Sequence, residues 1–325
     1  MWRILPLLPV TAGLLAAQQG SVAGPVVGFV FDGAVRAVRP ILGIPGASLM
    51  GDPVNFGFDL ASAWVAPRQD SAVVTGADRS VHLFRLSPGA ASERPFDGLS
   101  YTPQFVVFSP SGTAAALYAE GRVQVVTGLP EAPVLAGAID VAETRMRTVL
   151  RDRAPRVVHP AMALSDDGAL LLAAAGGVVR LFHTAGPTSS LMDAGFPALV
   201  AFARNSHDAA VLDAAAGLVL FHDLDGARAR QTVAEPDEGL ASAVGLAFSE
   251  DGSRLFVASA AARSVAAFDV ASGARSATAC DCTPAGLTPM GGLFRLNEPG
   301  SLPLWLLDAG VDGPRMVFVP AARAE

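Results

Sequence analysis

The stretch SEDGSRLFVASAAARSVAAFDVASG, residues 249–273, decides the fold, because most of the chain repeats its pattern. It opens with a tetrad at 249–252 in which Ser at the first position and Gly at the last suit a type I β-turn. Two apolar runs of strand length follow, separated by small and polar residues. The stretch therefore predicts a turn and two strands, with further strands at GLAFS before it and ARSATA after it.

Five other segments repeat this pattern of a turn tetrad and two apolar runs. The six tetrads end at Asp70, Gly112, Gly168, Asp208, Gly252 and Gly300, in steps of 42, 56, 40, 44 and 48 residues. Five of the second runs carry Phe near one register, namely Phe84, Phe182, Phe221, Phe268 and Phe318. This period, with several short strands per unit, is typical of a β-propeller in which each repeat forms one four-stranded blade.

The number of blades follows from the two ends of the chain. Residues 26–43 look like strands two and three of a further unit, because Val38 lies 46 residues before Phe84. The last unit, 297–320, ends at strand three, with Trp305 on its second strand. We predict an all-β, seven-bladed β-propeller of four-stranded antiparallel blades, with six or eight blades as alternatives. Strands from the N- and C-termini should close the ring, which removes a free sheet edge.

Composition limits the class of protein. The 51% hydrophobic and 16% charged fractions exclude a disordered chain. The formal net charge of −7 argues against a nucleic-acid partner. Beyond the N-terminus no apolar run reaches the roughly 18 residues that a membrane span needs. We expect a monomer with no membrane span in the mature chain, no cofactor and no bound metal.

The N-terminus has the pattern of a secretory signal. Arg3 is followed by an apolar stretch from Ile4 to Ala17 and then by polar residues. A charged residue, a short apolar region and a small-residue cleavage site define such a signal. We predict a signal peptide at 1–17, with an alternative end at 23, and a single propeller domain at 24–325. The mature protein should then be exported, to the periplasm or the extracellular space.

The 56-residue step marks an Arg-rich insertion at 138–158, expected as a helical turn or an elongated outer strand. A long loop on a rigid scaffold is a frequent binding surface. Its candidate partner-binding residues are Arg145, Arg147, Arg151 and Arg153, with Arg156 nearby. The alternative is a solvated excursion in which these arginines pair with Asp140, Glu143 and Asp152.

Residues 249–273 resemble the YVTN-type repeat of bacterial β-propellers, whose consensus runs Ser-Pro-Asp-Gly, Leu-Tyr-Val-Ala, Val-Ser-Val-Ile-Asp and Thr-Gly. The matching positions are Ser249, Asp251, Gly252, Leu255, Val257, Ala258, Val265, Phe268, Asp269 and Gly273. The match is looser elsewhere; residues 109–112 read Ser-Pro-Ser-Gly, without the Asp. The resemblance spans nearly the whole mature chain and implies architecture rather than activity. Propellers of this kind include lactonase-like enzymes, surface-layer proteins and scaffolds, and no catalytic motif of theirs matches here.

Residues with metal-binding chemistry have simpler interpretations. His82, His183 and His222 fall on third strands, where equivalent slots on different blades lie far apart, so repeat position explains them better than a metal site. Asp223 and Asp225 in HDLDG lack the distal Glu of a calcium loop and fit a β-turn. The tetrad carboxylates, Asp166, Asp167, Glu250 and Asp251, are interpreted as turn formers.

The chain has two cysteines, Cys280 and Cys282 in ACDCTPAG. In an exported protein they can pair only with each other, and a spacing of two residues requires a local turn for closure. Asp281, Thr283 and Pro284 favour such a turn. A disulfide and a pair of free thiols both remain open.

Two functions fit these observations. The first is an exported, non-catalytic propeller that acts as a binding or scaffold module for a protein or small molecule on one propeller face. The alternative is a lactonase-like hydrolase with a site in the central channel. Acidic residues and histidines converging at one channel mouth would favour the enzyme, whereas a wall of Val, Ala and small polar residues would favour the binding module.

Overall fold

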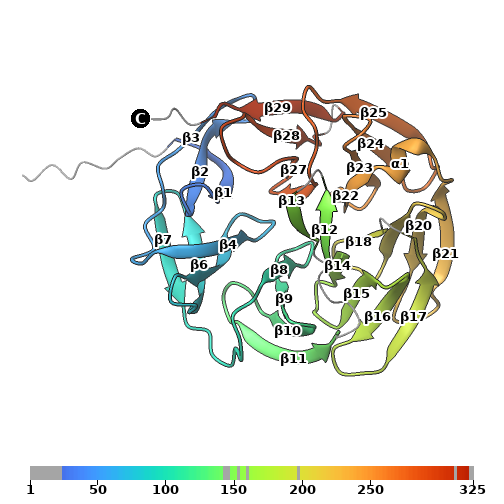
Figure 1. Ribbon diagram of the computed structural model, residues 1–325, viewed down its shortest axis with the longest axis horizontal. Coiled ribbons are helices and arrows are strands. Elements are labelled where there is room, and N and C mark those ends of the chain that lie inside the picture. Colours follow the sequence, from blue (N-terminus) through green and yellow to red (C-terminus); the bar gives the residue numbers. More distant parts are fainter. Residues whose placement is uncertain are drawn as a thin grey trace, which may run out of the picture.

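A computed structural model describes the protein as a ring of β-sheets (Figure 1). It describes residues 24–141, 147–151, 154–158, 161–195, 198–310 and 313–321, with the backbone alone for 147–151 and 154–158. In this part of the chain seven antiparallel sheets form the blades, and one two-stranded hairpin stands apart from them. Among the described residues, the only helix is the short α1 (Glu238–Ala241). The predicted all-β, seven-bladed propeller is confirmed.

Each blade is one continuous segment whose strands follow one another from the ring axis outward. The first blade contains β1 (Val26–Asp32), β2 (Ala37–Ile44) and β3 (Ala47–Met50). The second contains β4 (Leu60–Val65), β5 (Ser71–Gly76), β6 (Val81–Ser87) and β7 (Ala90–Arg94). The third contains β8 (Phe105–Phe108), β9 (Ala114–Ala119), β10 (Arg122–Thr127) and β11 (Val134–Asp140).

The remaining four blades repeat the same order. The fourth contains β14 (Ala161–Leu164), β15 (Leu170–Ala175), β16 (Val178–His183) and β17 (Thr188–Asp193). The fifth contains β18 (Ala198–Phe202), β19 (Ala209–Asp213), β20 (Gly217–His222) and β21 (Ala229–Ala234). The sixth contains β22 (Ala243–Phe248), β23 (Arg254–Ser259), β24 (Ser264–Asp269) and β25 (Arg275–Ala279). The seventh contains β26 (Thr288–Met290), β27 (Leu293–Arg295), β28 (Leu304–Asp308) and β29 (Arg315–Val319).

The tetrad at 249–252 joins the first and second strands of the sixth blade, as predicted. The amide of Gly252 donates to the carbonyl of Ser249 at 2.9 Å. Gly252 has φ 73°, a left-handed conformation that glycine adopts without a Cβ clash. Because successive strands are antiparallel, the turns of this kind all lie on one face of the ring, which we call the turn face.

The second blade places a non-glycine residue in the same position of its turn. The amide of Ala66 donates to the carbonyl of Ser71 at 2.9 Å, as Ser249 does to Arg254 at 2.8 Å. Gln69 therefore corresponds to Gly252, and it adopts φ 63°. The turn therefore comprises residues 66–69, one residue before the tetrad 67–70 that the sequence alignment predicted.

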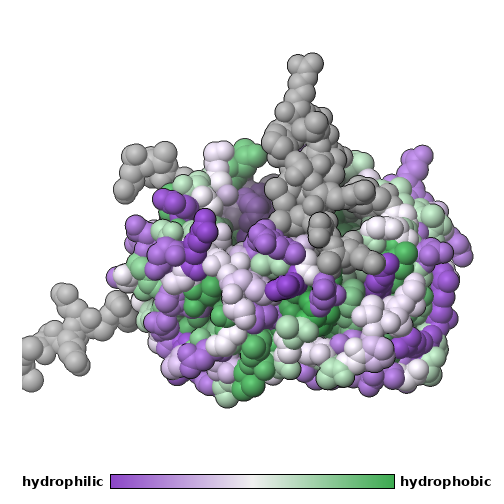
Figure 2. Space-filling model, turned by 60° about the horizontal axis from the view of Figure 1, so that its bottom comes forward, coloured by the Kyte–Doolittle hydropathy of each residue, from purple (hydrophilic) through white to green (hydrophobic). Residues whose placement is uncertain are grey.

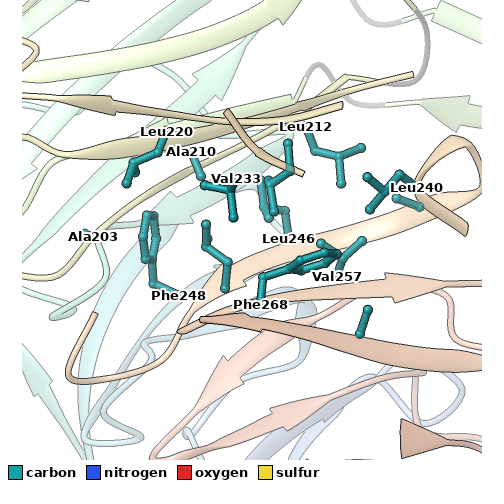
Figure 3. Packing of buried hydrophobic residues seen from close by; sticks show 14 residues of the cluster. Ala203, Ala210, Leu212, Leu220, Val233, Leu240, Leu246, Phe248, Val257 and Phe268 are labelled. Carbon is teal, nitrogen blue, oxygen red and sulfur yellow. The ribbon is translucent and has the colours of Figure 1, made fainter. Parts of the chain in front are cut away.

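The aligned phenylalanines of the third strands are buried between neighbouring blades. Phe84, Phe182, Phe221 and Phe268 are 4%, 4%, 4% and 1% exposed. In Figure 3, Phe268 of the sixth blade packs with Leu246 against Val233 of the fifth. The sequence alignment of these four positions is confirmed.

Of the two terminal units, the first agrees with the sequence alignment and the last differs from it. The first blade has three described strands, β1, β2 and β3. Gly28 lies beside Gln69 at the turn face and Asp32 lies beside Pro299 and Leu304 towards the opposite face, so β1 and β2 run as the second and third strands of a blade. In the seventh blade the pair Gly291–Gly292, with φ 56° and 85°, closes a two-residue hairpin between β26 and β27. Trp305 and Phe318 consequently lie on strands three and four, and Phe318 is 49% exposed.

The ring closes where the first blade meets the seventh (Figure 1). Each of these blades has its own sheet, so they adjoin without sharing one. Val30 and Ile41 of the first blade pack in one apolar cluster with Leu304 and Val317 of the seventh. Packing of one sheet on the other, rather than exchange of a strand, therefore holds the two ends of the ring together.

The turn of the second blade forms two hydrogen bonds at this junction, one to each of the two blades that meet there. The side-chain carbonyl of Gln69 accepts a hydrogen bond from the Phe29 amide of the first blade at 2.6 Å. The carbonyl of Pro67 accepts one from the Gly291 amide of the seventh blade at 2.7 Å. Three blades are thus joined at one point on the turn face.

The outer wall mixes hydrophilic and hydrophobic residues in the view of Figure 2. Leu42, Ile44 and Leu49 are exposed neighbours on β2 and β3, where Leu42 pairs with Leu49. Across the described ranges, none of the helices has the length and apolar character required to cross a membrane.

Candidate functional site

The innermost strands of all seven blades surround an axial cavity of about 790 Å³. Its wall is formed by residues of these strands, including Phe31, Val65, Phe108, Ala201 and Met290. Turns of the turn face border the cavity at one of its ends. A volume of this size is within the range of small-molecule sites.

The wall of this channel is apolar. Val106, Met162, Val200, Leu246 and Leu287 contribute aliphatic or thioether side chains from five blades. Three half-buried aromatic side chains lie on consecutive blades, with Phe31 on β1, Trp64 on β4 and Phe108 on β8. The channel thus offers one aromatic arc and an otherwise aliphatic wall to a ligand.

Charged side chains gather at the mouth of the channel on the turn face. Five come from the turns and from the start of β23, namely Arg68, Arg204, Glu250, Asp251 and Arg254. We call these five residues the charged mouth. Arg295, the last residue of β27, and Glu298, in the connection from β27 to β28, line the cavity away from the turn face. No sequence pattern groups the charged mouth, although four of its residues lie in or directly beside the recognised turns.

Most of the charged mouth is paired within itself or with a neighbour. Arg204 of the fifth blade forms an ion pair with Glu250 of the sixth. Arg68 lies 2.7 Å from Asp70 behind the mouth. Away from the mouth, Arg295 lies 2.8 Å from Glu298. These pairs hold the long side chains in place.

Arg254 is held by uncharged groups. Its guanidinium donates to the carbonyl of Ala309 at 3.2 Å and lies 5.6 Å from the centre of the Phe256 ring. A guanidinium has five N–H donors, so further donors of Arg254 can serve a ligand at the mouth.

Asp251 is a fixed anion. Its carboxylate accepts hydrogen bonds from Ser249 Oγ at 2.6 Å, Ser253 N at 3.1 Å and Ser253 Oγ at 2.8 Å. These bonds, with that of Ser249 Oγ the strongest cause, lower the pKa of Asp251 from 3.8 to about 2. A carboxylate with so low a pKa is a poor general base near neutral pH, because it holds a proton too weakly.

We predict that Asp251 makes folding sensitive to acid. Its folded pKa lies below its unfolded value, so its stabilising effect is complete above about pH 4 and is lost as the pH falls towards 2. Asp251→Asn should therefore melt at a lower temperature than the parent at pH 7, and the gap should narrow at pH 2.5. Thermal melts at the two pH values measure this; a gap of equal size at both would contradict it.

Of the four tetrad carboxylates, Asp167 and Asp251 act as turn formers, as predicted. Asp166 and Glu250 instead bond neighbouring blades, and Asp167 also bonds His207 of the fifth blade at 2.9 Å. Asp167 accepts hydrogen bonds from Ala169 N at 3.0 Å and Ser165 Oγ at 2.6 Å within its own turn. Asp166 accepts from Ser111 N of the third blade and Asn205 N of the fifth, both at 2.7 Å. Asp166 therefore joins three neighbouring turns.

The three candidate histidines lie on separate blades and away from the channel. His82 pairs with Glu93, His183 bonds the carbonyl of Pro187, and His222 bonds Asp208 at 2.8 Å. Within the described residues, no group of three or more His, Cys, Asp or Glu side chains is placed to hold a metal ion.

The Asp223–Asp225 segment forms the turn between β20 and β21. Asp223 accepts a hydrogen bond from Ala227 N at 3.0 Å, and Asp225 lies 3.6 Å from His183. The turn interpretation of these carboxylates agrees with this geometry.

The Arg-rich insertion contains the hairpin β12 (Arg147–Arg151) and β13 (Ala154–Val158). It connects the outer strand β11 to the inner strand β14, so it leaves the ring on the face opposite the turn face. Arg145 and Arg153 lie outside the described residues, and of Arg147 and Arg151 the backbone alone is described. In its described residues the insertion consists of the end of the outer strand β11, up to Asp140, and this hairpin.

Cys280 and Cys282 are joined by a disulfide, with their Cα atoms 5.0 Å apart. They lie in the connection from β25 to β26 and are 5% and 8% exposed. Both pack into the apolar cluster between the sixth and seventh blades, beside Phe256 and Leu287. The disulfide is therefore a part of the blade interface and not of the channel.

Comparison with known proteins supports the fold. No protein-family model matches the chain, and no curated protein matches it by sequence. A "putative 6-phosphogluconolactonase" from Bacteroides fragilis superposes with a TM-score of 0.55 at 14% identity, over 90% of this chain and 92% of that one. A protein of unknown function from Desulfotomaculum acetoxidans gives 0.56 at 13% identity, over 91% and 100%. Likeness at this level of identity shows a shared propeller architecture.

Proposed function

We propose that this protein is an exported, non-catalytic β-propeller that binds a small molecule in its axial channel. The observation that carries this proposal is the apolar wall of a 790 Å³ cavity that ends in a charged mouth. Ligand sites are commonly apolar cavities with a few polar groups at one end that orient the ligand.

A lactonase-like hydrolase is the second candidate, because Glu250, Asp251 and Arg254 lie at the mouth of the same cavity. Two features favour binding over catalysis. Asp251 has a pKa of about 2, and Glu250 is engaged by Arg204. A general base near neutral pH needs a higher pKa and a free carboxylate.

The test uses N-phenyl-1-naphthylamine, an uncharged apolar fluorophore, titrated into the purified mature protein. We expect one bound probe per chain. Ala201→Phe places a ring in the channel wall and should weaken binding about tenfold or more, because it fills space the probe needs. The matched control is Ile44→Ser, on the exposed apolar patch of β2.

The two variants separate the channel from the outer surface. Loss of binding in Ala201→Phe with unchanged binding in Ile44→Ser supports the channel. The reverse pattern, or no stoichiometric binding by the parent, would contradict it. Hydrolysis of δ-valerolactone by the parent that Glu250→Gln abolishes would replace the proposal with the hydrolase.

Export is part of this proposal and rests on the N-terminal pattern of Arg3 and the apolar stretch up to Ala17. Expression of the chain with its own N-terminus in a bacterial host, followed by N-terminal sequencing, tests it. We expect a mature chain that begins at Gln18, or at Gly24 for the alternative site, in the exported fraction. An intact N-terminus in the cytosolic fraction would be incompatible with export.

A further inference from the structure

The charged mouth carries no net charge when Asp70, the ion-pair partner of Arg68, is counted with it. Three guanidinium groups, those of Arg68, Arg204 and Arg254, face three carboxylates. The carboxylates are Asp70, Glu250 and Asp251. A ligand with a net charge at this place would leave one sign in excess at the end of an apolar channel, where water screens it less than at an open surface.

The mouth offers both kinds of hydrogen-bonding group. Guanidinium groups donate only, and ionised carboxylates accept only. A hydroxyl group does both, so a head that carries several hydroxyls can use donors of Arg254 and lone pairs of Glu250 at the same time. Anionic heads would meet these carboxylates as like charges, and cationic heads would meet the arginines.

The channel below the mouth suits an apolar group. Phe31, Trp64 and Phe108 form its aromatic arc, and Met162 and Val200 belong to the aliphatic wall. Burial of apolar surface against such side chains is the main favourable contribution to binding, while the polar mouth sets the orientation of the ligand.

We propose that the channel binds an uncharged amphiphile, with its apolar part along the wall and a hydroxyl-bearing head at the charged mouth. This inference rests on the proposed function and narrows it to a class of ligand. The ligand enters from the turn face, since the charged mouth lies there.

Three probes with the same eight-carbon tail test the choice of head: octyl β-D-glucoside, octanoate and octyltrimethylammonium. Each is titrated calorimetrically below its critical micelle concentration. We expect a 1:1 complex with the glucoside at least about tenfold tighter than either ion, because an ionic head loses hydration without a net opposite charge. In a Trp305→Phe background, a change in Trp64 fluorescence places the tail in the channel.

Variants that remove one charge from the mouth test whether its net charge selects the head group. Arg254→Gln leaves one negative charge in excess and should tighten octyltrimethylammonium several-fold while weakening octanoate. Glu250→Gln leaves one positive charge in excess and should do the opposite. Arg230→Gln, an exposed arginine on the outer strand β21, is the matched control and should change none of the three affinities. Melting curves of all variants confirm that the propeller is folded.

The outcomes separate this inference from the proposed function. Octanoate or octyltrimethylammonium binding as tightly as the glucoside would overturn the assigned head while channel binding stands. Equal affinities in Arg254→Gln, Glu250→Gln and Arg230→Gln would overturn the role of the charged mouth. Failure of all three probes, together with no binding of N-phenyl-1-naphthylamine, would overturn both.

Discussion

Phe268→Ala should lower the free energy of unfolding by about 3–5 kcal/mol. The side chain is 1% exposed and lies in the cluster between the fifth and sixth blades (Figure 3). Its removal leaves a cavity that the two sheets cannot fill, because their strands are fixed by hydrogen-bonded neighbours. Chemical denaturation followed by fluorescence measures the change.

Phe318→Ala is the matched control for this substitution. Phe318 carries the same side chain and was aligned with Phe268 in the sequence, yet it is 49% exposed on the outer strand β29. We expect a loss of less than about 1 kcal/mol, because water already covers much of the ring. Equal losses for the two variants would show that the assignment of strands in the seventh blade is wrong.

Ile41→Asp should open the ring or prevent folding, with an expected loss of at least several kcal/mol. Ile41 is 0% exposed and packs between the first and seventh blades with Val30, Leu304 and Val317. A carboxylate at this position would be buried without a partner, which is among the most costly changes that a core can receive. Soluble yield, far-UV circular dichroism and thermal melting measure the effect.

Ile44→Asp, three residues along the same strand, is its control. Ile44 is 57% exposed, so its carboxylate would remain in water, and we expect a change within about 1 kcal/mol. A folded Ile41→Asp variant with parental melting would contradict closure of the ring by packing at this interface.

The sequence alone determined the interior blades. Residues 249–273 contain the turn, the two strands and the buried Phe268, because turn chemistry and alternation of side chains are local properties that recur in each unit. The same register predicted the burial of Phe182 and Phe221. The number of blades followed from the repeat length, and the turn roles of Asp167 and Asp251 from their place beside Ser and Gly.

The C-terminal unit was harder to assign, for a physical reason. Whether a strand is second or third in a sheet depends on its neighbours, and its own sequence does not state this. Residues 26–43 were assigned correctly, whereas the strand of Trp305 was shifted by one position. The Gly291–Gly292 pair between two short apolar runs was a hairpin signal that would have corrected the seventh blade.

The channel and its mouth were decided by tertiary structure only. Trp64 and Phe108 precede ordinary turns, and nothing local distinguishes them from core residues. Arg204 and Glu250 come from different blades and meet because the sheets pack side by side in a ring. The turn that contains Pro67 and Gln69 joins three blades, through a contact forty residues away in one direction and one more than two hundred residues away in the other. Repeats encode the blades locally, whereas a site on the axis exists only after all seven innermost strands have been brought around it.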